Sequence, residues 1–212
     1  MLEADHLVVV APSMPEGLAH ARACLGLDLP EGGRHREMGT RNHLLRLGDG
    51  LFLEVIAADE AASAPERPRW FGLGDPAGVR ASWAAGRRLR SFVARTRSLD
   101  LLLACHGARL GEAVRVSRGD LSWRFGLRPD GALPEDGALP CSMDWGEAGC
   151  PAPRMPDLGV RLVGWSVAHP APGDLAALYG AIGLVDPPAI RHGPEVRFAA
   201  RIATPAGERT LT

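Results

Sequence analysis

The stretch HREMGTRNHLLRLGDGLFLEVIA, residues 35–57, contains two apolar segments on either side of a Gly48-Asp49-Gly50 turn. Residues 41–47 and 51–57 therefore predict two strands joined by that turn. One carboxylate, Glu54, interrupts the second strand. Because strand side chains alternate between faces, Glu54 shares a packed or concave face with Phe52 and Ile56. A buried carboxylate without a partner is costly, so we expect a cationic or hydrogen-bonding group to meet Glu54.

The residues before this stretch extend it into a larger unit. Residues 6–11 form a β-branched run that predicts a buried strand, and residues 12–16 open a helix that reaches about Leu25. Gly26 follows as a helix stop, and residues 34–38 predict a further short strand. Residues 1–58 thus predict one βαβββ module.

The same order of elements returns later in the chain. After a connection at residues 59–88, we expect a strand at 91–95, a helix at 98–106, and strands at 112–117, 121–127 and 141–145. The order repeats without repetition of residues, which predicts a second βαβββ module at 89–146. Residues 147–212 predict a shorter extension, with a strand at 160–168, a helix at 173–183 and a hairpin at 195–203 and 208–211. We expect the extension to pack with the modules as one unit, and we assign the chain to the α+β class.

Composition limits the classes of partner. The chain has 212 residues, 46% hydrophobic content and a formal net charge of −1, so no strong field attracts nucleic acid or an acidic membrane surface. All basic residues are Arg, so we discount Arg clusters as signals of a binding site. We therefore expect a small-molecule ligand and no nucleic-acid or membrane partner.

Targeting signals and cysteines favour a cytoplasmic protein. The first residues are acidic and lack the basic and apolar regions of a secretory signal, and the longest apolar runs have only strand length. The four cysteines show no CxxC spacing and no dense disulfide framework. We expect unpaired thiols in a reducing compartment.

Four segments together resemble a known family. DHLVVVAPSMPEG and GGRHREMGTRNHLLRLGDGLFLEVIA, followed later by RSFVARTRSLD and SRGDLSWRFGL, are similar to the glyoxalase-like branch of the vicinal oxygen chelate superfamily over residues 5–145. The resemblance implies paired βαβββ modules that form a curved mixed sheet around a shared cleft. It also implies a divalent metal in that cleft and reactions such as isomerisation, epimerisation, epoxide opening or ring-cleaving dioxygenation. Some members hold no metal and sequester drugs, so fold is better supported than activity.

The resemblance also implies ligand positions for a metal. It places the first-strand ligand on His6 and the last-strand ligand on Glu54, a pair that suits Zn, Fe, Mn or Ni. In the second module it sets Ser91, a poor ligand, opposite His6, and Asp144 opposite Glu54. The implied set is His6, Glu54 and Asp144 around one divalent metal, with a metal-free cleft as the alternative. In other interpretations His6 bonds the backbone, or Glu54 pairs with an Arg such as Arg46.

Further residues are candidates for binding a substrate at the mouth of the first module. Asn42 and His43 point to opposite faces, and the resemblance favours Asn42 for the cleft. The substrate-binding set that we predict is His35, Met38, Thr40, Asn42, Trp70 and Trp123.

The function that follows is a glyoxalase-like protein that acts on a small oxygen-bearing molecule in the cleft. A metal would act as a Lewis acid, and Glu54 would be either a ligand or the catalytic base. The alternative is a non-catalytic small-molecule or drug-binding protein, which Ser91 favours. A homodimer that uses the sheet face as its interface is a third alternative.

Overall fold

The structure is a computed structural model that describes residues 1–119 and 121–212. Its helices are α1 (Met14–Leu25), α2 (Pro76–Ala84), α3 (Leu99–Leu110) and α4 (Pro172–Ala181). Its strands are β1 (Leu2–Val10), β2 (Glu31–His35), β3 (Thr40–Arg46), β4 (Phe52–Ala58), β5 (Leu89–Arg95), β6 (Glu112–Arg118), β7 (Leu121–Leu127), β8 (Cys141–Asp144), β9 (Arg161–His169), β10 (Leu184–Val185), β11 (Ala189–His192), β12 (Arg197–Thr204) and β13 (Gly207–Leu211).

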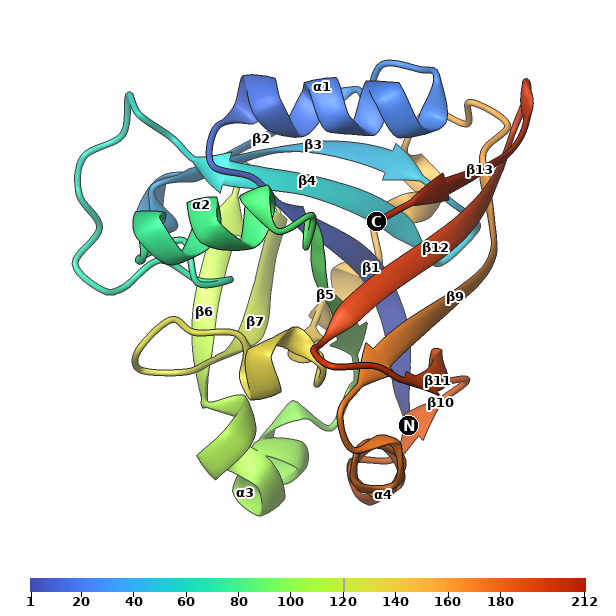
Figure 1. The fold of residues 1–212 in the computed structure, drawn as a ribbon. Coiled ribbons are helices and arrows are strands. Elements are labelled where there is room, and N and C mark those ends of the chain that lie inside the picture. The colour runs from blue at the N-terminus through green and yellow to red at the C-terminus, as the bar shows by residue number, and fades with distance from the viewer. Residues whose placement is uncertain (120) are drawn as a thin grey trace.

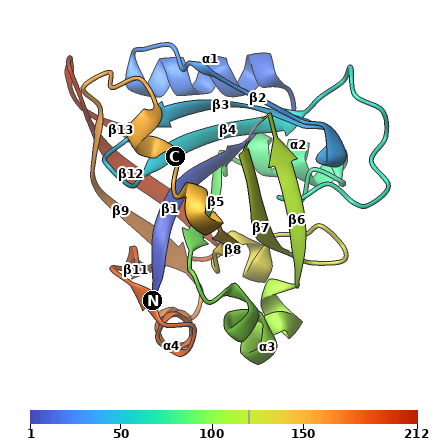
Figure 2. The same ribbon diagram turned by 180° about the vertical axis from the view of Figure 1, so that it is seen from behind.

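The large sheet confirms the predicted α+β class and the paired βαβββ modules. Its strands lie in the order β2-β3-β4-β1-β5-β8-β7-β6, and β10 adds to the end of β1. The two modules meet at its centre, where β1 and β5 pair antiparallel. The sheet curves so strongly that its edge strands approach each other (Figures 1 and 2). At this approach the Ser117 hydroxyl donates to Glu37, with 2.9 Å between oxygens.

Local signals explain where the first helices begin and end. The Ser13 hydroxyl accepts from the backbone of Glu16 and caps α1, and Gly26 ends the helix with a φ of 74°. Helix α2 was missing from the prediction, which treated residues 59–88 as a connection. Its start carries a recognisable cap, because Asp75 accepts from the backbone of Gly78 at 3.0 Å. The short strands β10 and β11 were also not predicted.

Alternation along β1 divides the interior into two cores. Leu7 and Val9 belong to an outer core between the convex face of the sheet, α1 and the C-terminal sheet. Val8 and Val10 belong to an inner core inside the curve of the sheet. The inner core also contains aromatic side chains such as Phe125, so side chains fill most of the concave space.

The C-terminal extension forms its own four-stranded sheet in the order β11-β9-β12-β13. It packs on the convex side of β5, where Trp165 and Phe198 lie with ring centroids 4.7 Å and 6.0 Å from Phe92. The Tyr179 hydroxyl of α4 donates to the carbonyl of Ala138 at 2.7 Å. The extension thus covers the outer core and leaves the concave side to the two modules (Figure 1). In the described part of the chain, no helix has the length and apolar character needed to cross a bilayer.

Candidate active site

A bulge in β1 brings two consecutive polar side chains together. Ala4 pairs with Ala94 and His6 pairs with Val93, which leaves Asp5 without a partner on β5. Neighbouring side chains on a regular strand point to opposite faces, but the extra residue of a bulge turns its side chain. Consequently the carboxylate of Asp5 lies 2.7 Å from Nδ1 of His6, and both side chains are buried.

Asp5, His6 and Glu54 form a chain of carboxylate, imidazole and carboxylate. Nε2 of His6 lies 3.4 Å from a carboxylate oxygen of Glu54 on β4. The ring of Phe52 stacks on His6, with centroids 4.4 Å apart, and fixes its plane. The second oxygen of Asp5 accepts from the indole of Trp145 at 2.9 Å. Both ring nitrogens of His6 therefore face a carboxylate in a buried environment.

The chain continues from Glu54 toward the second module. The amide nitrogen of Asn42 donates to the other carboxylate oxygen of Glu54. The amide oxygen of Asn42 accepts from the guanidinium of Arg118 on β6 at 3.2 Å. Glu54 thus has the partners that its buried position requires. The alternative partner Arg46 is wrong, because its guanidinium binds Asp49 at 2.7 Å.

These contacts determine the charge of the central pair. Burial alone would lower the pKa of His6, but the hydrogen bonds to Asp5 and Glu54 outweigh burial and raise the pKa to about 9. Burial alone would raise the pKa of Glu54, but His6 and Asn42 together lower it to about 2. At neutral pH the pair is therefore an imidazolium and a carboxylate.

The His6–Glu54 pair lines a cavity of about 20 Å³ inside the curve of the sheet. A space of this size holds roughly one water molecule. Of the residues predicted for the site, six line the cavity: His6, Glu54, His35, Asn42, Trp70 and Trp123. His43 points away and contacts the carbonyl of Leu29 at 2.8 Å. Most of the predicted residues thus come together.

Thr40 and Met38 support the site without lining the cavity. The hydroxyl of Thr40 accepts from the indole of Trp70 at 3.1 Å and lies 3.2 Å from Nδ1 of His35. Burial lowers the pKa of His35 to about 4, so its ring is neutral at neutral pH. The buried hydroxyl of Thr40 needs an acceptor for its own proton, and Nδ1 of His35 can accept it only when that nitrogen carries no proton. We therefore assign the ring proton of His35 to Nε2. Met38 is buried in the inner core.

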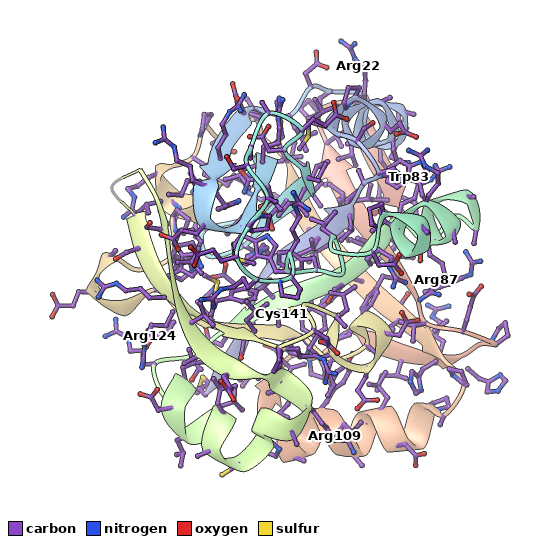
Figure 3. The ribbon with its side chains drawn as sticks, turned by 90° about the vertical axis from the view of Figure 1, so that its left-hand side faces the viewer. Arg22, Trp83, Arg87, Arg109, Arg124 and Cys141 are labelled. Carbon is purple, nitrogen blue, oxygen red and sulfur yellow. The ribbon has the colours of Figure 1, made fainter. Side chains whose placement is uncertain are left out.

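Asp144 lies apart from the other predicted ligands. Its carboxylate binds Arg124 at 2.8 Å and lines a different pocket, of about 420 Å³, near the start of α3. In Figure 3, Arg124 of β7, the partner of Asp144, lies at the outside of the molecule, whereas Cys141, at the start of β8, lies inside. The expected convergence of Asp144 with His6 and Glu54 is therefore not present.

The sheet register shows which residue of the second module corresponds to Glu54. In the antiparallel pair β1–β5, Val8 pairs with Ser91 and His6 pairs with Val93. When the two modules are superimposed, β1 falls on β5, so His6 corresponds to Ser91 and Val8 corresponds to Val93. Val8 also pairs with Glu54, and its counterpart Val93 pairs with Cys141. The counterpart of Glu54 is thus Cys141, and the prediction of Asp144 was wrong because the register of β8 differs from the one expected. Burial raises the pKa of Cys141 to about 12, which keeps it a neutral thiol.

The donor set is too small for a complete metal centre. The 3.4 Å between His6 and Glu54 equals, within about 0.1 Å, the separation of two ligands on a tetrahedral ion with bonds of about 2.0–2.1 Å. Asp5 also holds His6 as carboxylates commonly hold metal-binding imidazoles. However, zinc sites use at least three protein ligands, and the described residues contain no group of three His, Cys, Asp or Glu arranged for a metal. The residues therefore do not fit a resident metal.

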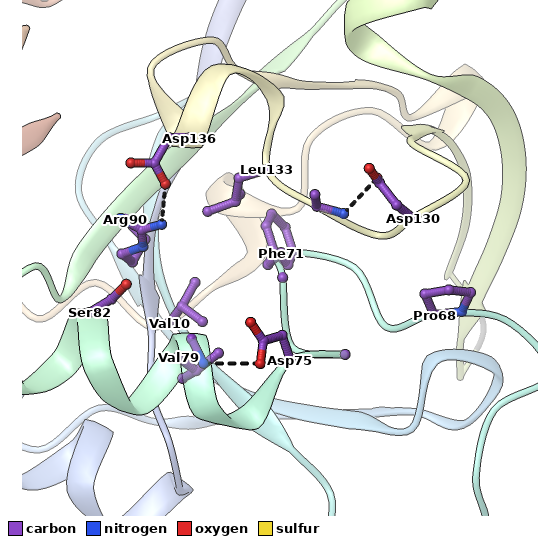
Figure 4. Close-up of a pocket in the computed structure, with 14 residues that line it drawn as sticks. Val10, Pro68, Phe71, Asp75, Val79, Ser82, Arg90, Asp130, Leu133 and Asp136 are labelled. Carbon is purple, nitrogen blue, oxygen red and sulfur yellow. Dashed lines mark hydrogen bonds and ion pairs between the residues drawn. The ribbon is translucent and has the colours of Figure 1, made fainter.

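A larger pocket of about 590 Å³ adjoins the small cavity. Phe71 lines both spaces and separates them. Figure 4 shows its ring between Leu133 and the start of α2. The backbone of Phe71 has a φ of 55°, a strained value for a residue with a side chain. The contact of Arg90 with Asp136 at 2.8 Å forms the far wall. This pocket was not predicted from the sequence, because α2 and residues 130–136 meet only in the folded chain.

Two curved βαβββ modules around a shared buried cleft define the glyoxalase-like architecture of the vicinal oxygen chelate superfamily. The chain belongs to the glyoxalase-like domain family, whose sequence model matches residues 4–183. This match confirms the resemblance found in the sequence.

One solved structure supports the fold. A hypothetical protein from Staphylococcus aureus is similar with a TM-score of 0.63 at 12% identity, over 93% of this chain and 88% of that one. A methylmalonyl-CoA epimerase from Mycobacterium tuberculosis matches with a TM-score of 0.37 at 16% identity, over 66% of this chain and 85% of that one. The latter overlap is too weak to carry an argument about function. No curated protein matches the sequence.

Proposed function

We propose that the chain takes a small oxygen-bearing molecule into the cleft between its modules and exchanges a proton with it. The observation that carries this proposal is the buried chain Asp5–His6–Glu54, whose central pair lines a cavity. Buried charges are costly to keep in a fold, and perturbed pKa values concentrate at functional sites. The reaction class that fits is isomerisation or a related lyase step.

The two central groups have complementary roles in this proposal. The imidazolium of His6 carries a proton on Nε2 and donates to an oxygen of the bound molecule, where it stabilises negative charge as it develops. The carboxylate of Glu54 accepts a proton from an adjacent atom of the same molecule. Asp5 binds the opposite ring nitrogen and holds His6 in orientation, as an aspartate does in a catalytic triad.

Access to the pair requires one side chain to move. The cavity holds about one water molecule, whereas the adjoining pocket has about 590 Å³. Phe71 is the partition between the two spaces and has a strained backbone. We propose that the ligand enters from the larger pocket and displaces the ring of Phe71.

A metal-assisted version of the function needs more than this chain shows. A divalent Zn, Fe, Mn or Ni ion would find two donors in His6 and Glu54, and a third protein ligand is not present among the described residues. Neither the proton donation by His6 nor the proton transfer to Glu54 uses a metal. Metal analysis of protein purified without chelator, with His6→Ala as the comparison, tests this version.

Non-catalytic binding is the second candidate, and two observations favour it. A pKa of about 2 makes the carboxylate of Glu54 a weak base. The second module carries Ser91 and Cys141 at the positions that match His6 and Glu54, so only one module offers acid–base chemistry. In this form the protein would sequester its ligand without converting it.

Ligand screening separates the two candidates. Wild-type protein and the Glu54→Gln variant are screened by thermal shift against small hydroxy, oxo and carboxylic compounds, and each hit is followed by NMR for turnover or hydrogen–deuterium exchange at carbon. Exchange in wild type that disappears in Glu54→Gln supports proton transfer. Stabilisation without exchange supports sequestration, and no hit that depends on His6 or Glu54 contradicts both.

We also propose that the protein works in the cytoplasm. All four cysteines are free thiols, and two of them, Cys141 and Cys150, have their pKa raised to about 12 mainly by burial. Such thiols are stable in a reducing compartment. Fractionation of the native host cells tests this proposal.

A further inference from the structure

Arg118 enters the cleft from the second module along a path that glycine provides. It is the last residue of β6, and its side chain lies against β2 at the opposite edge of the sheet. A Cβ on Gly33 would lie 2.9 Å from Cδ of Arg118, so the side chain of Arg118 would have to shift to admit it. The guanidinium then lines the same cavity as His6 and Glu54. The backbone of β2 therefore holds Arg118 in the site.

Most of the donors of Arg118 have no partner among the described residues. A guanidinium has five N–H donors, and within the described chain Arg118 donates one hydrogen bond, to Asn42 at 3.2 Å. It forms no ion pair with a described carboxylate. By contrast Arg124, on the adjacent strand, binds both Asp100 and Asp144 at 2.8 Å. Arg118 is thus a cation that is partly removed from water and directed at the cavity, with donor capacity in reserve.

His35 supplies a second donor to the same space. Its Nδ1 is occupied by Thr40, and its protonated Nε2 has no partner within the described chain. The ring meets Trp70 and Trp123 edge to face, with centroids 4.9 Å and 5.9 Å away, so its orientation is fixed. The positive charge of Arg118 is close enough to act on His35. The guanidinium donors of Arg118 and the Nε2–H of His35 therefore both face the cavity.

We infer that the ligand carries a carboxylate, which Arg118 binds with its free donors and His35 with Nε2–H. This inference rests on the proposed function and names its substrate class: a small acid with a second oxygen beside the carboxylate, such as a 2-hydroxy acid. The planar fork of a guanidinium matches two carboxylate oxygens, and the neighbouring oxygen of the ligand then faces His6 and Glu54. Arg118 and His35 determine which molecules bind, and the His6–Glu54 pair acts on them.

Two probes of similar size test whether the carboxylate is recognised. Lactate and propane-1,2-diol share adjacent oxygens and differ in the carboxylate. Both are titrated into the full ¹⁵N-labelled chain at pH 7, with inorganic phosphate as a third probe, while the Nε–H resonance of Arg118 and the amides of β1 and β4 are followed. We expect lactate to shift these signals saturably, and the diol and phosphate to bind at least about tenfold more weakly.

Variants assign the effect to Arg118. We expect Arg118→Gln to weaken lactate binding about 10- to 100-fold, as loss of hydrogen bonds to a charged group does. We expect Arg118→Lys to bind lactate more tightly than Arg118→Gln but more weakly than wild type, because lysine keeps the positive charge but lacks the planar guanidinium. Arg115→Gln is the matched control, since Arg115 lies on the same strand, is exposed and points away from the cleft. Gly33→Ala keeps the guanidinium but blocks its path, and we expect it to weaken lactate binding as well.

The outcomes discriminate this inference from the proposed function. Equal binding of lactate and the diol, unchanged in Arg118→Gln, overturns the carboxylate assignment and leaves the proposed function in place. Preference for phosphate also overturns the assignment. If no probe shifts the amides of β1 and β4, the carboxylate assignment fails, while the ligand screen with Glu54→Gln decides the proposed function separately. Should Arg118→Gln prove unfolded by its melting curve, Arg118→Lys and Gly33→Ala still decide the question.

Discussion

Asp5 and His6 are neighbours in the chain and also partners in the fold, with 2.7 Å between the Asp5 carboxylate and Nδ1 of His6. A regular strand forbids such a contact, and the bulge at Asp5 permits it. The contact orients the imidazole and keeps it charged.

Removal of the Asp5 charge is expected to lower the pKa of His6. Asp5→Asn preserves the shape of the side chain but deletes the charge that helps raise this pKa to about 9. An opposite charge at this range shifts a pKa by roughly one to three pH units, so the variant should titrate that much lower. NMR titration of the His6 ring in the metal-free protein measures it. Asp157→Asn, which removes an exposed carboxylate paired with Arg161, is the control. An unchanged His6 titration would show that Asp5 does not act on the ring.

His35 is expected to make the fold sensitive to mild acid. The pKa of His35 is about 4 in the folded chain and about 6.5 when unfolded, so the unfolded state takes up the proton first as pH falls. The neutral ring contributes its full stability above about pH 6.5, and this contribution is lost as pH falls toward 4. The total loss amounts to ~3 kcal/mol.

Urea unfolding between pH 4 and pH 7 measures this dependence. His35→Asn should flatten the acid limb of the stability curve, whereas the exposed His192→Asn should leave it as in wild type. Parallel curves for His35→Asn and wild type would contradict the prediction.

The strained backbone of Phe71 leads to an unusual order of stability among its variants. Phe71 is buried, so Phe71→Ala should cost about 3–5 kcal/mol. Glycine normally costs more than alanine, but at a φ of 55° it avoids the roughly 1–2 kcal/mol that a Cβ costs in the left-handed region. We therefore expect Phe71→Gly to be at least as stable as Phe71→Ala in urea unfolding. A clear advantage for alanine would mean that residue 71 does not hold this conformation in solution.

Metal content should be low and independent of His6. Two donors bind a divalent ion weakly compared with the three or four of a complete zinc site. Elemental analysis of protein purified without chelator should show far less than one equivalent of Zn, Fe, Mn or Ni, and EDTA should leave the melting temperature unchanged. Stoichiometric metal that His6→Ala removes would establish a metal centre and refute this prediction.

The regular elements were predictable because their signals are local. The alternation at residues 6–11, the Gly48-Asp49-Gly50 turn and the Gly26 stop depend on near neighbours. Both modules were predicted, but with element ends displaced by several residues: β1 begins at Leu2 and not at residue 6, and β2 ends at His35 and not at residue 38. Glu54 was correctly directed inward by alternation alone. Helix α2 was missed although its Asp75 cap is a local signal.

The composition of the site was predictable only in part, because it depends on contacts between distant segments. Asp5 was overlooked, since regular alternation directs it away from His6 and only the pairing with β5 shows the bulge. Arg118 was discounted as one Arg among many. Asp144 was predicted as the counterpart of Glu54, and Cys141 was not considered, because neither strand sequence determines the parallel register of β5 and β8. The concave space was expected to be open, and aromatic side chains fill most of it.

The bulge at Asp5 also sets the phase of β1. Beyond it, odd-numbered residues such as Leu7 and Val9 face the outer core, whereas before it the even-numbered Leu2 does so. Because of this one extra residue, Leu2 faces the outer core together with Leu7 and Val9, although its number is even and theirs are odd. Loss of that residue would restore a regular ladder and exchange the positions of Leu2 and Glu3, so the Asp5–His6 contact and the packing of the start of β1 depend on the same irregularity.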